Sequence, residues 1–410
     1  MIRTMPAPAL PNRSNGGALG VFAVFLRLGL TSFGGPIAHL GYFREEFVAR
    51  RAWLGERRFA ELLALCQFLP GPASSQLGFA IGLERAGYRG GVAAWLGFTL
   101  PSAVLMLAFA SGAGLLAGDV GMGASAGLKA VAVAVVAHAV WGMARTLTPD
   151  LRRIGIALLA VAVALLLPGS PGQLTAVLVG VALGVALCRD GGGEGNEDPP
   201  APERVSRRAA AGSLVALFGL LALLPILAAV TRLPLLAFAD AFFRAGALVF
   251  GGGHVVLPLL QGEPAIAAAV APEQFLAGYA AAQAVPGPMF SFAAYLGAVA
   301  QPGGGALTAA TALVAVFLPG LLLLVGVLPF WNRLRRIPSV AAGVRGANAA
   351  VVGLLAAALY SPIGTAGLTG PAPVVIAVCA LVLLLFRAPA WLAVLLGAAG
   401  GALAGALGLI

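Results

Sequence analysis

The chain has 410 residues, of which 60% are hydrophobic and only 10% are charged. An ordinary soluble domain carries about 25% charged residues, so this composition excludes a soluble fold and makes a lipid bilayer the expected solvent. The net charge of +10 comes almost entirely from arginines between apolar runs. That pattern is typical of membrane topology and gives no reason to expect a nucleic-acid partner.

The apolar runs predict the membrane segments, because roughly 20 helical residues cross a bilayer core of about 30 Å. A polar stretch rich in Gly, Pro and charge, residues 189–211, predicts a cytoplasmic linker between an N-terminal repeat (1–188) and a C-terminal repeat (212–410). We therefore predict an all-α polytopic membrane protein with about 13 apolar segments. The segments before the linker are 21–42, 59–82, 90–117, 124–144, 153–168 and 172–188, and those after it are 212–231, 235–260, 272–300, 304–330, 339–360, 372–387 and 389–410.

Two motifs occur twice, in the same order. The segment Phe25–Gly35 is matched 217 residues later by Phe242–Gly252, with Arg, Gly, Phe and Gly-Gly in register. The segment Arg58–Pro72 is matched 216 residues later by Gln274–Pro288, and both end in Gln-x-x-Pro-Gly-Pro. Internal repetition of this kind predicts two homologous units.

The second unit carries one additional leading segment, 212–231. An extra span reverses the membrane orientation of everything after it, so the repeats are predicted to be inverted. Inverted repeats are common in secondary transporters, which bind substrate near the bilayer midplane where the repeats meet.

The arginines indicate how the first segments enter the membrane. Thirteen simple spans would put the arginines between Arg44 and Arg58 on the side opposite the N-terminus, against the positive-inside tendency. If the Gly-Gly and Pro-Gly-Pro segments are re-entrant hairpins, almost all arginines of the first half become cytoplasmic, together with the N-terminus and the linker. We predict hairpins, with thirteen full spans as the alternative.

Arg27 and Arg244 occupy equivalent positions inside apolar segments, with six residues between each arginine and the first glycine of its pair. An arginine at a helix centre costs at least about 2.5 kcal/mol on insertion scales, so it needs a partner or a water-filled cavity. A guanidinium offers paired N–H donors to an oxyanion, which makes both residues candidate anion ligands. The alternative is snorkelling to the headgroups, or pairing with a carboxylate such as Asp240.

The glycine pairs and the Pro-Gly-Pro turns break their helices, and the freed N–H groups and half-helix N-termini can bind an anion. Close helix crossing through glycine, or a plain kink, is the alternative. His254, like His39, is a candidate anion ligand or proton relay, without metal-ligand spacing. With the serines and glutamines beside the turns, the predicted substrate-binding residues are Arg27, Phe33, Gly34, Gly35, Gln67, Pro70, Gly71, Pro72, Ser74 and Ser75 in the first repeat, and Arg244, Phe250, Gly251, Gly252, Gly253, His254, Gln283, Pro286, Gly287, Pro288 and Ser291 in the second.

No nucleotide-binding or hydrolase motif is present, so neither a primary pump nor an enzyme is expected. The doubled Phe-Gly-Gly and Gln-x-x-Pro-Gly-Pro motifs resemble the chromate transporter family, in its long, fused form with two oppositely oriented halves. The resemblance covers most of the chain and implies export of chromate across the bacterial inner membrane, chromate resistance, and sulfate as a competitor. We expect no cofactor, and no metal because metal-ligand spacing is absent; protons are an optional coupling ion, and a homodimer is left open. An importer of sulfate or another oxyanion is the alternative, as is a membrane scaffold or enzyme without transport.

Overall fold

The computed structural model describes residues 17–112, 118–189, 205–250, 253–300, 304–334 and 336–409, and all regular structure in these residues is helical. Six of the helices are long and apolar enough to cross a membrane. Four shorter apolar helices accompany them. The predicted all-α membrane fold is therefore confirmed.

In its described residues, the first half contains seven α-helices and opens with two broken segments. Its helices are α1 (Ala18–Thr31), α2 (Gly35–Arg44, prolonged by a π-helical turn, Glu45–Arg50), α3 (Glu56–Phe68), α4 (Ala73–Gly112), α5 (Asp119–Leu147), α6 (Leu151–Leu166) and α7 (Ser170–Leu187). The long α4 is two helices joined by a sharp turn, because Ala86 and Gly87 have non-helical angles and Gly87 has a φ of +67°. The limb 73–85 is thus separate from the span that follows.

The second half repeats this order after one extra helix, α8. Its helices are α8 (Arg207–Thr231), α9 (Pro234–Leu248), α10 (Val256–Gln261), α11 (Pro264–Ala269), α12 (Pro272–Ala284), α13 (Phe292–Val299), α14 (Ala306–Val327), α15 (Trp331–Leu334), α16 (Pro338–Ala358), α17 (Thr365–Gly367), α18 (Pro371–Leu385) and α19 (Ala390–Ala406). Short helical turns precede α10 and α13, at Gly253–Val255 and Met289–Ser291. The helix predicted over 212–231 is α8.

Each of the four broken segments folds back on itself. Phe25 in α1 lies against Phe43 and Phe47 beyond the first break, with ring centroids 5.6 and 4.9 Å apart. The 14 residues of α1 extend about 21 Å, which is short of a bilayer core. The predicted hairpins therefore fold back on themselves, and their entry into the membrane from one side stays a prediction. The limbs of the other three hairpins are joined by Arg58 and Glu84, by Arg244 and Glu263, and by Phe275 and Phe292.

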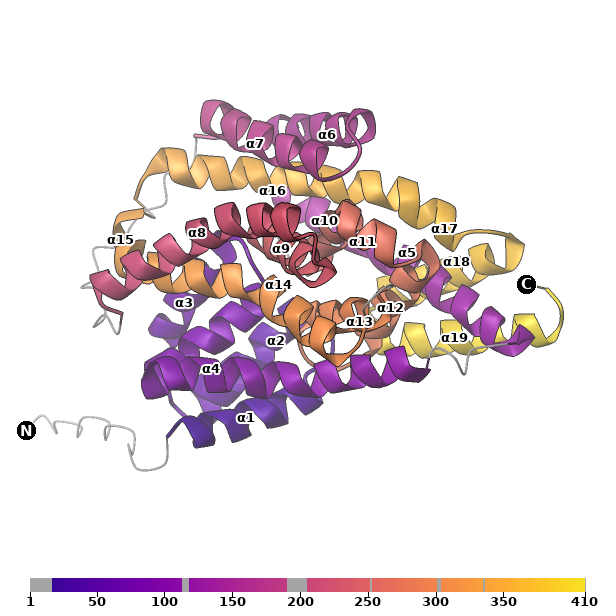
Figure 1. Cartoon of the computed structure of the whole chain (residues 1–410), viewed down its shortest axis with the longest axis horizontal. Coiled ribbons are helices and arrows are strands. Elements are labelled where there is room, and N and C mark those ends of the chain that lie inside the picture. Colours follow the sequence, from indigo (N-terminus) through magenta and orange to yellow (C-terminus); the bar gives the residue numbers. More distant parts are fainter. Residues whose placement is uncertain are drawn as a thin grey trace, which may run out of the picture.

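Equivalent helices make equivalent contacts in the two halves. Gly29 of α1 packs against the backbone of Phe98 in α4, and its counterpart Gly246 of α9 packs against the backbone of Val316 in α14. The counterparts run in opposite directions: in Figure 1 the long limb of α4 leads toward the right, whereas α14 leads from α13 leftward to α15. This arrangement fits the predicted inverted repeats.

The two repeats are interlocked through glycine-lined helix crossings. Helix α7 of the first repeat packs on α16 of the second, where Gly184 meets Gly346. In the same way α19 of the second repeat packs on α5 of the first, where Gly127 faces the backbone of Gly397. Small residues let helix backbones approach closely in lipid, where the hydrophobic effect does not drive association. Each half therefore completes its packing against the other.

Candidate anion site

The four helix breaks meet at one place between the repeats. The backbone N–H of Gly71, in the first Pro-Gly-Pro turn, donates to the carbonyl of Val249 at 2.7 Å. The backbone N–H of Gly287, in the second turn, donates to the carbonyl of Ser32 at 2.9 Å. Ser32 and Val249 are equivalent in the repeat, as are the two glycines, so these bonds form a symmetric pair. The hairpin tips of opposite repeats are thus joined backbone to backbone.

Glycine is required in both turns. Gly71 has a φ of +124° and lies against Gly320, so a Cβ at Gly71 would come 3.0 Å from the Cα of Gly320. Gly287 has a φ of +96°, and a Cβ there would come 3.0 Å from the Oγ of Ser102. Ser102 and Gly320 are themselves one residue beyond the aligned prolines, Pro101 and Pro319. The tips therefore rest on the same point of the long helices in both repeats.

On the first-repeat side, polar residues surround the joined tips. We call this set the central polar cluster, and all its members are almost fully buried: Ser32, His39, Ser74, Ser75, Gln76, Thr99 and Ser102. The ring of His39 connects two breaks, with Nε2 3.3 Å from the carbonyl of Ser32 and Nδ1 3.5 Å from the Oγ of Ser74. The amide of Gln76 donates to the carbonyls of Pro70 and Gly320, at 3.0 and 2.9 Å. The cluster thus ties the first repeat's breaks to α14 of the second.

Several polar atoms of the central polar cluster have no hydrogen-bond partner among the described residues. Three of these unpaired atoms are buried hydroxyl oxygens, namely Ser32 Oγ, Ser75 Oγ and Thr99 Oγ1. The fourth is a buried amide oxygen, Gln76 Oε1, which can only accept a hydrogen bond. Leaving a buried polar group unpaired costs about 1–3 kcal/mol, so such groups in a native protein call for an explanation. The three hydroxyls can each donate to an oxyanion, whereas Gln76 Oε1 cannot. Gln76 therefore acts through its amide, as a link between the tips.

The N-terminus of a helix points into the same region. The short limb of α4 begins at Ala73, directly after Pro72, and its first helical backbone bond is donated by Gln76 to the carbonyl of Pro72. The N–H groups before that bond lack intrahelical acceptors, and the helix dipole adds partial positive charge. These amides and the unpaired hydroxyl of Ser75 belong to the same helix start, and such groups can replace part of the hydration shell of an oxyanion.

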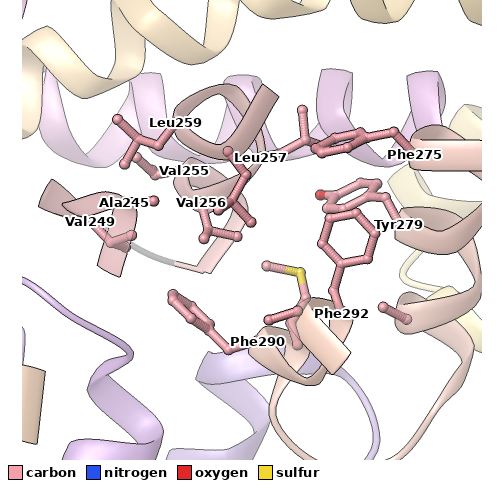
Figure 2. Packing of buried hydrophobic residues seen from close by; sticks show 14 of the residues in the cluster. Ala245, Val249, Val255, Val256, Leu257, Leu259, Phe275, Tyr279, Phe290 and Phe292 are labelled. Atoms are coloured by element: carbon pink, nitrogen blue, oxygen red, sulfur yellow. The ribbon is translucent and has the colours of Figure 1, made fainter. Parts of the chain in front are cut away.

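The equivalent region of the second repeat is apolar. Figure 2 shows buried aromatic and aliphatic side chains of this region, among them Val256, Phe290 and Phe292. Phe290 packs on Phe317 and Phe292 packs on Phe275, with ring centroids 5.6 and 5.1 Å apart. In the repeat alignment Ser74, Gln76, Thr99 and His39 correspond to Phe290, Phe292, Phe317 and Val256. The polar site thus belongs to one repeat only.

The structure brings together some of the first repeat's predicted residues and separates others. The turn Pro70-Gly71-Pro72, with Ser74 and Ser75, lies at the central polar cluster. Gly34 and Gly35 form the first break, with φ of +101° and +77°. Phe33 packs on Trp391 of α19, with ring centroids 6.5 Å apart. Arg27 and Gln67 have exposed side chains, and within the described part of the chain no ion pair involves Arg27.

The second repeat's predicted residues lie in a different environment. Pro286, Gly287, Pro288, Ser291 and Gly253 are buried, and Phe250 is half-buried. His254 Nδ1 is 2.7 Å from the hydroxyl of Tyr279, and the amide of Gln283 contacts the sulfur of Met289. Arg244 is bound to Asp240, the alternative partner noted in the sequence, and also to Glu263. Gly251 and Gly252 lie outside the described residues, as do residues 190–204 of the linker.

Sequence reasoning missed four members of the central polar cluster: Ser32, Gln76, Thr99 and Ser102. Each is a polar residue inside a predicted apolar segment, and that signal was available. It was weak, because single serines and threonines satisfy themselves within helices, as Thr31 does by donating to the carbonyl of Arg27. Only their convergence distinguishes them.

Oppositely directed repeats that meet through broken helices define this chain as an integral membrane protein with the architecture of a secondary transporter. The chain belongs to the chromate transporter family, whose model matches residues 19–186 and again residues 236–403. The two matched ranges are the two repeats found in the sequence. The predicted family membership is therefore confirmed.

Individual relatives resemble the chain across both halves. It is 31% identical over 348 residues to a chromate transport protein of Pseudomonas aeruginosa, with 82% of this chain and 79% of that protein covered. It is 29% identical to a probable chromate transport protein of Synechococcus elongatus, with 82% of each covered, and 28% identical to a chromate transport protein of Cupriavidus metallidurans, with 82% and 80% covered. No solved structure matches the chain.

Proposed function

We propose that this protein exports chromate from the cytoplasm across the inner membrane, and that the central polar cluster binds the anion during transport. The observation that carries the proposal is the set of unpaired buried hydroxyls beside a helix N-terminus, where the two repeats meet. Membership of the chromate transporter family and the names of the relatives support chromate as the substrate.

Alternating access follows from how the tips are joined. The contact between opposite hairpins rests on two backbone hydrogen bonds, Gly71 to Val249 and Gly287 to Ser32. A site near such a junction can open to either side when one repeat rocks against the other, without a large change in either. The polar lining on the first-repeat side then holds the anion, while the apolar lining on the second-repeat side excludes water.

Energetics favour export. A membrane potential is worth about 2.3 kcal/mol per elementary charge per 100 mV, so an inside-negative potential drives a dianion outward by about 4.6 kcal/mol per 100 mV. No ATP-dependent step is needed. Cells that carry the protein are expected to resist chromate.

The test is uptake of labelled chromate into everted membrane vesicles, in which export from the cell becomes uptake into the lumen. Uptake should depend on the imposed potential, and unlabelled sulfate should compete because it is also a tetrahedral dianion. Vesicles with empty vector give the baseline. Absence of uptake above that baseline, at verified expression, would contradict the proposal, and uptake only into right-side-out vesicles would make the protein an importer.

A further inference from the structure

Two buried carboxylates share one guanidinium in the first hairpin of the second repeat. The Nη2 atom of Arg244 lies 2.9 Å from Asp240 Oδ2 and 2.7 Å from Glu263 Oε2. We call these three residues the Arg244 cluster. Asp240 is 6% exposed and Glu263 is 3% exposed. Asp240 Oδ1 is buried without a hydrogen-bond partner among the described residues.

No other charge compensates the Arg244 cluster within the described elements packed on α9. Helices α10, α11 and α14 carry no charged residue, and α8 carries only Arg207 and Arg208, in its first two positions. The only other titratable side chain of the hairpin, His254, is bonded to Tyr279. Near Glu263, Ser170 donates to the carbonyl of Gly262 and Gln173 donates to that of Pro258, both as neutral groups.

In the equivalent hairpin of the first repeat, the cations outnumber the buried carboxylates. Glu46, which aligns with Glu263, is buried and pairs with both Arg50 and Arg51. One carboxylate there has two cations, whereas two carboxylates in the Arg244 cluster have one. The position equivalent to Asp240 is Ala23, so the first repeat has no second acid.

The charges of the Arg244 cluster indicate that one of its carboxyl groups holds a proton. Two ionised carboxylates beside one guanidinium leave a negative charge that is buried and uncompensated, and isolated buried charge is costly. A proton on one carboxyl makes the cluster neutral and gives the unpaired Oδ1 a means to bond. Because the two carboxyls share a single cation, they titrate as a unit.

A cavity lies next to the Arg244 cluster. A cavity of about 240 Å³ is lined by residues next to Glu263, namely Gln261 and Gly262, together with Gly169 and Gln173. The Arg244 side chain is 36% exposed. None of the three cluster residues lines this cavity, so the route we infer for the proton runs from the cavity past Gln261 and Gly262 to Glu263.

We propose that the Arg244 cluster binds one exchangeable proton, and that proton entry through it is coupled to chromate exit. This inference rests on the proposed function. The coupling runs along α9, since Arg244 lies five residues before Val249, whose carbonyl holds the tip of the opposite repeat through Gly71. A change in charge at the Arg244 cluster alters the pairing across this hairpin and hence the position of the joined tips.

The inverted arrangement sets the direction of exchange. With a cytoplasmic N-terminus, the hairpins of the second repeat enter from the external side, so the cluster takes a proton from external water. That proton is held as a carboxylic O–H and is released to cytoplasmic water when the tips have moved. No other bond is made or broken, and chromate leaves as the proton enters.

The experiment uses everted vesicles containing the full-length protein, with the bath at fixed pH and the membrane potential clamped. Bath and lumen are both kept alkaline enough for chromate to remain a dianion on both sides, so trapping of hydrogen chromate in the acidic lumen does not contribute to the accumulation ratio. For one proton exchanged per cycle, making the lumen one pH unit more acidic than the bath should raise the chromate accumulation ratio about tenfold. Glu263→Gln and Asp240→Asn should each retain uptake driven by potential and lose this response. Glu46→Gln should retain both.

The outcomes separate the two proposals. A wild-type protein that accumulates chromate under an imposed potential but ignores the pH gradient overturns proton coupling and leaves chromate transport intact. A normal gradient response in either Glu263→Gln or Asp240→Asn overturns the assignment to the Arg244 cluster. Failure of the wild type to take up chromate under any gradient refutes the proposed function itself. Either neutralised variant suffices if the other does not reach the membrane.

Discussion

Replacing Ser75 with alanine should change anion affinity and protein stability in opposite directions. The hydroxyl of Ser75 is buried and has no partner among the described residues, so in the free protein it carries a desolvation cost of about 1–3 kcal/mol. Alanine removes one oxygen and that cost with it. We therefore expect the free energy of unfolding of Ser75→Ala to be equal to or greater than that of the wild type.

Anion binding should change in the opposite direction. A hydrogen bond to a charged partner contributes about 1.5–3 kcal/mol, which corresponds to a loss of about 10- to 150-fold in chromate affinity. The measurements are calorimetric titration with chromate in detergent and thermal unfolding followed by tryptophan fluorescence. Most destabilising mutations weaken stability and binding together, so opposite signs are a specific signature.

Ser291→Ala tests the asymmetry between the repeats. Ser291 aligns with Ser75 and is equally buried, but it lies between Phe290 and Phe292 in the apolar region. Its loss should leave chromate affinity unchanged. Wild-type affinity in Ser75→Ala would refute the role of the central polar cluster, and an equal loss in both variants would show that the repeats share binding.

Three further substitutions test the architecture. Gly127→Ala should destabilise the protein by about 1–3 kcal/mol, because the added Cβ would overlap the carbonyl of Gly397. Gly142→Ala, on the same helix, faces open space and should stabilise the protein by up to about 1 kcal/mol. Equal effects of the two substitutions in thermal unfolding would refute the interlocked packing. Gly71→Ala should cost about 1–3 kcal/mol through its φ of +124° and reduce chromate uptake, and normal uptake would mean that the tips need not stay joined. Arg244→Ala should destabilise the protein by about 3–5 kcal/mol in chemical denaturation, since it leaves two buried carboxyl groups without their cation. Arg27 is exposed, so the stability of Arg27→Ala should stay within about 0.5 kcal/mol of wild type. Comparable losses from both arginines would contradict this difference.

The two arginines show where reasoning from the sequence stops. Arg27 and Arg244 are aligned, and the sequence treats them alike. In the structure Arg27 is exposed on α1 while Arg244 is held by Asp240 and Glu263. Glu263 comes from the far limb of the hairpin, so the difference depends on a contact that the local sequence does not contain. An anion-binding role for either arginine stays a prediction.

The same limit hid most of the central polar cluster. In water, the polar face of an amphipathic helix indicates which side is exposed. In lipid, both the exposed and the buried faces of a helix are apolar, so Thr99 and Ser102 of α4 give no sign of the direction they face. Their role becomes visible only when the tip of the opposite repeat is found against them.

By itself, the sequence determined the membrane as solvent, the two repeats, the positions of the four repeated helix breaks and the family. These features follow from local chemistry: apolar length, the missing N–H of proline, and motifs that recur in register. The tertiary structure decided which breaks join, that α7 and α19 cross to the opposite repeat, and that one repeat is polar and the other apolar at the junction. Those features depend on side chains brought together from distant segments, and chain periodicity carries no information about such pairings.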